Sequence, residues 1–220
     1  MSKTKESLNE WTSSLMQEIP QMLVKLLDQK NGESIERLQL VDVEISLGKK
    51  NQGETISQLK RYSSANNNFI HVCSFIYDHS LDIRIAYFVR GQKKFYQPTA
   101  QMSQQFLWEA WMSIDRAWVH NALKDAGQEN SALSSLELAQ LYGRKDIQIP
   151  SQLVLFLLIK EALEAWPKNK DSLEYFHVTF FKGLELDRPL EKSNIVNDKD
   201  LELAIRQDGQ VTTCLKAWVQ

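Results

Sequence analysis

Asp115 is the residue whose surroundings in the sequence most suggest chemistry. If residues 102–125 form one helix, a turn of about 100° per residue places Asp115 in the middle of an apolar arc. That arc contains three tryptophans, Trp108, Trp111 and Trp118. A carboxylate held among apolar side chains is costly to desolvate unless a cation or a hydrogen-bond donor pairs with it. The pattern therefore predicts a partner for Asp115.

Two interpretations of Asp115 follow from that requirement. In the first, Arg84 or Arg90 of a preceding strand supplies the charge, and the ion pair joins the helix to a sheet. In the second, the three tryptophans line a pocket that binds a partner or an apolar ligand, with Asp115 as its polar anchor. Destabilisation of an Asp115→Ala variant without any change in binding would leave only the first.

The segment from Gly48 to Thr55 has the glycine spacing of a nucleotide-binding loop, G-x-x-x-x-G-K-[ST]. Glu54, however, stands where that chemistry needs a lysine, and its charge would repel phosphate oxygens. The residues before the loop also alternate between apolar and polar, whereas the strands before such loops are buried on both faces. We therefore expect an ordinary surface turn.

Histidine and cysteine side chains gather only around one predicted hairpin. His71 and Cys73 would share a strand face there, but two ligands do not make a zinc site. His79 lies close to them in sequence, and the remaining candidates, His120, His177 and Cys214, have no recognisable metal-ligand spacing. No nucleophile motif is found either. The sequence therefore predicts no metal, no cofactor and no catalytic residue.

Strand patterns dominate the chain before residue 90. Apolar and polar residues alternate over 38–47, which predicts a half-exposed strand, and a weak helical pattern covers 56–62. Residues 69–77 and 81–90 are rich in β-branched and aromatic residues and predict a hairpin.

The register of this hairpin depends on its turn. With His79 and Ser80 as a two-residue loop, Ile76 lies opposite Ile83 and one face becomes largely apolar. Both faces carry bulky residues, which favours a position inside the sheet.

Helical patterns dominate the middle of the chain. The predicted helices cover 102–125, a short segment that opens at Ser134–Ser135 and ends near Gly143, and 151–166 after Pro150. Tyr175 to Leu186 reads as a strand, and 201–205 and 211–218 form a hairpin around Asp208–Gly209. The last segment is also compatible with a helix.

The N-terminal residues 8–27 carry apolar side chains at spacings of three and four, which predicts an amphipathic helical arm within residues 1–30. Such a segment either packs on its own domain or serves as a docking arm. In the second case Trp11 anchors another protein or a second copy of the chain.

Composition excludes several classes of partner. The chain has 26 basic and 28 acidic residues among 220, so it lacks the cationic excess typical of proteins that bind nucleic acid or anionic membranes. The longest apolar run, Leu153 to Ile159, is too short to span a bilayer, and no signal segment is recognisable. Two cysteines, expected to be reduced, fit a cytoplasmic protein. We found no internal sequence repeat.

These patterns predict an α+β fold: an antiparallel sheet covered by helices, preceded by the N-terminal helical segment. Residues 31–220 are expected to form a single domain. Six tryptophans and the missing catalytic motifs favour a non-enzymatic protein–protein interaction protein, such as an adaptor, an assembly factor or an immunity-type inhibitor. One alternative is a carrier of a small apolar ligand between the aromatic helix and the sheet. The other is an enzyme whose site becomes visible only in the tertiary structure.

Overall fold

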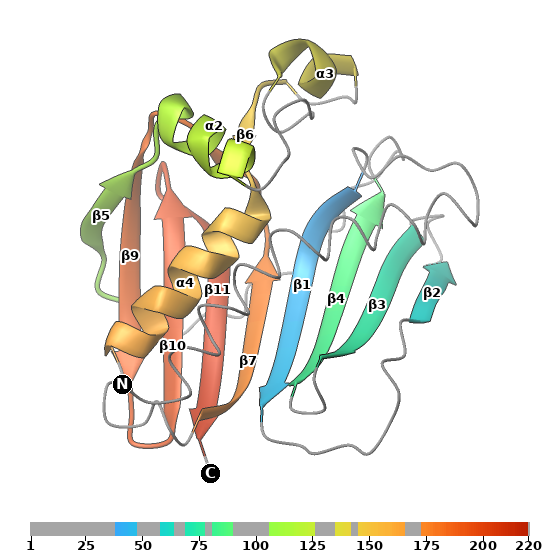
Figure 1. Cartoon of the computed structure of the whole chain (residues 1–220). Coiled ribbons are helices and arrows are strands. Elements are labelled where there is room, and N and C mark those ends of the chain that lie inside the picture. The colour runs from blue at the N-terminus through green and yellow to red at the C-terminus, as the bar shows by residue number, and fades with distance from the viewer. Residues whose placement is uncertain are drawn as a thin grey trace.

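A computed structural model of the chain describes residues 38–47, 58–63, 69–77, 81–89, 106–125, 135–141, 145–165 and 173–219 (Figure 1). In the strands between residues 58 and 89 it describes the backbone. The predicted N-terminal arm and the loop from Gly48 to Thr55 lie outside the described residues.

The described residues form strands and helices in mixed order. The strands are β1 (Leu38–Leu47), β2 (Gln58–Ser63), β3 (Phe69–Tyr77), β4 (Leu81–Val89), β5 (Glu109–Ser113), β6 (Gln148–Ile149), β7 (Leu173–Phe180), β8 (Leu184–Glu185), β9 (Pro189–Val196), β10 (Asp200–Gln207) and β11 (Gln210–Val219). The helices are α2 (Arg116–Asp125), α3 (Leu136–Leu141) and α4 (Ser151–Ala165). The predicted α+β class, an antiparallel sheet with helices, is confirmed.

Nine strands form one antiparallel sheet in the order β2-β3-β4-β1-β7-β11-β10-β9-β5. From its central pair outward, the order is β1-β4-β3-β2 on one side and β7-β11-β10-β9 on the other (Figure 1). In each group of four, the strand that comes first in the chain pairs with the strand that comes last, β1 with β4 and β7 with β11. Eight of the nine strands therefore form two units of the same topology joined between β1 and β7, and β5 extends the second unit beyond β9, although no repeat is visible in the sequence.

Helix α4 lies across the face of the unit that contains β7 and β9 to β11 (Figure 1). The helix starts as predicted after Pro150, whose carbonyl accepts hydrogen bonds from the backbone N–H groups of Leu153 and Val154. Buried side chains of the helix and the sheet form one cluster that includes Leu153, Leu158, Ile159, Val43, Ile45, Phe176, Val178, Leu203 and Leu215. Fully burying each leucine or isoleucine contributes roughly 2 kcal/mol, so this cluster holds the helix on the sheet.

The hairpin of β3 and β4 forms inside the sheet as predicted, but its predicted register is wrong. Tyr77 pairs with Leu81, which leaves three connecting residues, and Ile83 lies opposite Phe75 instead of Ile76. Both strands have neighbours on either side, and their sequences carry bulky residues at alternating positions of both kinds, so the apolar pattern does not select one register.

The weak helical pattern over 56–62 was also misleading, because β2 is a strand that pairs with β3. Pairing with an adjacent strand outweighs a weak local preference.

The predicted long helix over 102–125 is wrong. Glu109–Ser113 is strand β5, which pairs with β9 at the sheet edge, and of the described residues 106–125 only Arg116–Asp125 is helical. An apolar stretch without a clear period fits a buried helix or a strand equally well, and here the first half pairs as a strand. The continuous apolar arc that was predicted for this helix is therefore not present.

The C-terminal hairpin forms around Asp208 and Gly209 as predicted, and β11 is a strand, not a helix. Both turn residues have positive φ, 52° and 72°, as a type I′ turn requires. The strand predicted for Tyr175 to Leu186 ends at Phe180 and resumes as the short β8, and β9 was not predicted.

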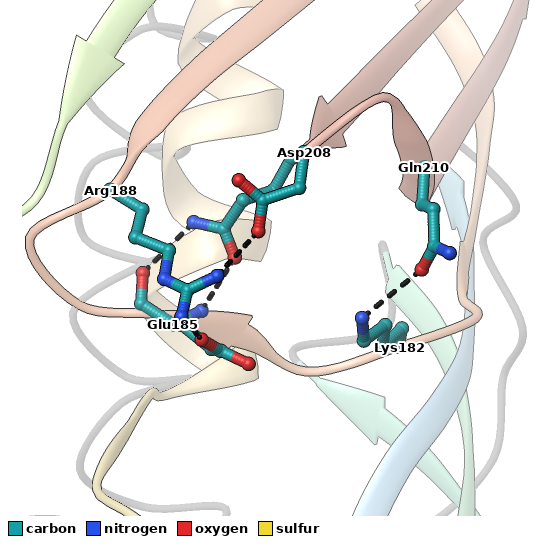
Figure 2. A network of polar contacts seen from close by, with 6 residues as sticks. Lys182, Glu185, Arg188, Asp208 and Gln210 are labelled. Atoms are coloured by element: carbon teal, nitrogen blue, oxygen red, sulfur yellow. Dashed lines mark hydrogen bonds and ion pairs between the residues drawn. The ribbon is translucent and has the colours of Figure 1, made fainter.

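A polar network ties this turn to the connection between β7 and β9 (Figure 2). The guanidinium of Arg188 binds Asp208 at 2.6 Å and Glu185 at 2.9 Å. The Gln207 side chain accepts from the Glu185 N–H and donates to the Glu185 carbonyl, at 2.8 and 2.9 Å. Lys182 donates to Gln210 at 3.1 Å. These bonds fix one end of the sheet.

Among the described residues, no helix is long and apolar enough to cross a membrane.

Candidate functional site

The candidate site lies where the two four-strand units meet, on the face of the sheet opposite α4. Side chains alternate between faces along a strand, and Val43, Ile45 and Val178 point into the core. Their neighbours Asp42, Glu44, His177 and Thr179 therefore share the other face. The register places Glu44 opposite His177 and Asp42 opposite Thr179.

His177 and Asp42 form the central contact of this site. Nε2 of His177 lies 2.8 Å from Oδ2 of Asp42, and the Thr179 hydroxyl donates to the same oxygen at 3.1 Å. Because a carboxylate can only accept, Nε2 carries the hydrogen and Nδ1 becomes the nitrogen that can take a proton from a substrate. The two side chains are 33% and 32% exposed, so solvent or a ligand can reach the pair.

The surroundings raise the pKa of His177 above its ordinary value of 6.5. The largest cause is the hydrogen bond to Asp42, followed by partial burial, which lowers the pKa. The charges of Asp42 and Glu44 raise it further, and the charge of Lys216 lowers it. The result is a stronger base than a free imidazole.

Asp42, Glu44 and His177 are also close enough to present three ligand atoms to a cation, since these atoms all lie within 4.8 Å of one another. Two observations favour a hydrogen-bonded pair instead. Nε2 already bonds to Asp42, and Lys216 lies directly opposite His177 on β11, where its charge opposes a cation. We therefore interpret the group as an acid–base pair.

Cys214 lies on the same face as His177 but does not suit a nucleophile. Its thiol is buried and donates to Glu202 at 3.6 Å. Burial is the largest cause that raises the pKa of Cys214 to about 12, and the charge of Glu202 adds to it. A protonated, buried thiol is inert.

The structure separates the residues predicted to form an aromatic site. Asp115 is exposed and caps α2, because its carboxylate accepts the Trp118 backbone N–H at 2.7 Å. Asp115 is therefore not the buried carboxylate that the ion pair and the aromatic pocket both assumed, and its hydrogen bond lies within its own helix end.

The three tryptophans have different environments. Trp118 is 41% exposed on α2, and Trp111 on β5 donates from its indole to Glu161 of α4 at 3.0 Å. Trp108 packs against the guanidinium of Arg206, which lies 4.5 Å from the ring centroid. They do not line a common site.

Arg84 and Trp11 complete the predicted set. The β1–β4 register places Arg84 opposite Glu44, so its backbone is level with the candidate site and not with Asp115. Trp11 lies outside the described residues. His177 and Asp42 were not predicted as a pair, because their strands are 135 residues apart in sequence. The alternation of polar side chains over 38–47 was the available signal.

Comparison with solved structures identifies the fold. No protein-family model matches the chain, and no curated protein matches it. Among solved structures, it resembles HtdX from Mycobacterium tuberculosis, with a TM-score of 0.66 and 11% identity over 95% of this chain and 86% of that one. It also resembles a MaoC-like dehydratase from Phytophthora capsici, with a TM-score of 0.63 and 10% identity over 88% and 72%. The chain has a hot-dog-like fold.

A further MaoC-like dehydratase has a TM-score of 0.65 and 10% identity over 95% of this chain and 82% of that one. The hot-dog-like neighbours named as dehydratases are enzymes, and this finding contradicts the expected non-enzymatic interaction protein. The expectation of an adaptor rested on the six tryptophans and on the missing catalytic motifs.

Proposed function

We propose that this chain is a dehydratase, an enzyme that removes water from a hydroxylated substrate, with His177 as the group that moves the proton. One observation carries the proposal. His177 Nε2 lies 2.8 Å from Asp42 Oδ2 on a partly exposed face of the sheet. The similarity in fold to MaoC-like dehydratases supports it by analogy.

The proposed reaction needs a base and an acid, and one imidazole can serve as both. Nδ1 of His177 takes a proton from the carbon next to a carbonyl, and the electrons of that C–H bond form the new double bond. The hydroxyl on the following carbon leaves with the C–O electron pair and takes the proton from Nδ1 as water. Asp42 holds Nε2–H and stabilises the imidazolium that forms in between.

The test is dehydration of a 3-hydroxybutanoyl thioester, followed by the ultraviolet absorbance of its conjugated product. We expect His177→Gln to lower kcat/KM by about 10²- to 10⁴-fold, the usual contribution of general acid–base catalysis. His120→Gln is the matched control, because His120 is an exposed histidine on α2. Equal rates for the two variants, or a wild-type chain without turnover, would refute the proposal.

The pH profile tests the role of Asp42. Because the neutral imidazole is the base, the rate should rise with pH through the pKa of His177, which lies above 6.5 in the wild type. Asp42→Asn removes the strongest cause of that raised pKa, so the rising limb should move to lower pH. If the pH at which the rate rises were the same in Asp42→Asn as in the wild type, Asp42 would not set the pKa of the reacting group.

The proposal also retains the expected cytoplasmic location, which the free, unpaired thiol of Cys214 supports.

A further inference from the structure

Two residues of β11 extend the candidate site along the sheet. The register places Lys216 opposite His177 and Trp218 opposite Tyr175. Residues two apart on a strand share a face and are separated by about 7 Å, so Tyr175 and Trp218 form the next row of side chains beside His177 and Lys216. A substrate bound at His177 can reach both rows.

Lys216 has the position and charge to interact with a substrate oxygen. Its side chain is 46% exposed, and its ammonium lies 3.5 Å from the Glu202 carboxylate, which is only 18% exposed. Glu202 therefore holds the ammonium near the face of the sheet that carries His177. A cation there would stabilise the negative charge that develops on a carbonyl oxygen when the neighbouring carbon loses its proton.

Tyr175 and Trp218 form an aromatic pair in the next row. Their ring centroids are 4.9 Å apart at an interplanar angle of 53°, and Trp218 is 39% exposed. An indole held against a second ring has a fixed orientation and still presents apolar surface to solvent. Such a surface favours a flat, apolar group over a flexible chain.

We propose that Lys216, Tyr175 and Trp218 form the substrate subsite of the acid–base pair. The subsite selects a carbonyl compound that carries a planar ring close to its reacting carbons, with the carbonyl oxygen at Lys216 and the ring on Trp218. This inference rests on the proposed function for the position of the reacting carbons. It concerns binding, which can be measured without turnover.

The experiment compares two product analogues, cinnamoyl and crotonyl thioesters of N-acetylcysteamine, which differ in a phenyl or a methyl group. Calorimetric titration of the full-length chain should show tighter binding of the cinnamoyl compound. We expect Trp218→Ala to weaken cinnamoyl binding about tenfold and to leave crotonyl binding nearly unchanged. Trp218→Phe, which keeps a ring, should restore most of the loss.

Lys216→Met should weaken both analogues about tenfold, because each presents the same carbonyl. Trp118→Ala is the matched control, since Trp118 is an equally exposed tryptophan on α2. Equal effects of Trp118→Ala and Trp218→Ala, or no preference for the phenyl compound, would overturn the inference. Binding that depends on Trp218 in a chain without dehydration would instead refute the proposed function and retain the subsite.

Discussion

Replacing Glu161 of α4 should destabilise the fold, because this side chain joins three elements. Its carboxylate accepts from the Lys192 ammonium of β9 at 2.5 Å and from the Trp111 indole of β5 at 3.0 Å. The side chains of Glu161 and Lys192 are each only 19% exposed. Lys192 also lies 3.7 Å from Glu109 of β5, which is well exposed. The network holds the edge strand against the helix.

The magnitude follows from what Glu161→Ala removes. The variant loses two hydrogen bonds to a carboxylate, and a hydrogen bond to a charged group contributes about 1.5–3 kcal/mol. In the variant, Glu109 still lies near the Lys192 ammonium, so the free-energy cost of leaving this partly buried charge without its main partner is reduced. We therefore expect the free energy of unfolding to fall by about 3 kcal/mol. Glu161→Gln keeps one acceptor oxygen, which can serve one of the two donors, and should cost about half as much.

Urea denaturation with linear extrapolation measures these changes. Glu164→Ala is the matched control, because Glu164 belongs to the same helix and its pair with Lys160 is long, at 4.0 Å, and more than half exposed. That variant should stay within about 0.5 kcal/mol of the wild type. A double-mutant cycle with Lys192→Met should yield a coupling energy above about 1 kcal/mol. A loss for Glu161→Ala no larger than for Glu164→Ala would refute this account of the edge strand.

Two further predictions concern the C-terminal strands. Gly209→Ala should lower the free energy of unfolding, measured by urea denaturation, by about 1 kcal/mol. At φ +72° an alanine is strained, and its Cβ would meet no atom within 4 Å, so only backbone strain contributes. An unchanged free energy of unfolding would contradict the observed turn. The second prediction concerns Cys214 in a Cys73→Ser variant, where it is the one thiol left. At pH 8 it should react with a thiol reagent about a thousandfold more slowly in the native than in the unfolded chain, because burial raises its pKa to about 12. Similar rates in the two states would contradict its burial.

Local signals in the sequence were sufficient where one residue type dictates the backbone. Pro150 ahead of an apolar run predicted the start of α4, because proline fixes φ, and Asp208–Gly209 predicted the last hairpin, because these residues tolerate the positive φ that the turn needs. The stretch around Trp111 carries no such restriction. Its apolar residues fit a helix and an edge strand alike, and pairing with β9, which is distant in sequence, decides between them.

The candidate site also depends on strand pairing that the local sequence does not reveal. The sequence indicates that Asp42 belongs to the polar face of a strand, and an alternating pattern also surrounds His177. Nothing in either segment indicates that these two strands pair with each other, or in which register. The apolar surroundings predicted for Asp115, by contrast, depended on a long helix that does not form.

The junction between β1 and β7 has a consequence for how such a site can arise. Two separate identical copies of one four-strand unit, meeting about a twofold axis, would present the same residue on both sides of their shared boundary. A single polypeptide is free of that symmetry. Here one side contributes acids, Asp42 and Glu44, and the other an imidazole and a hydroxyl, His177 and Thr179. Covalent linkage of the two halves permits this division of roles, and neither half alone holds the complete group.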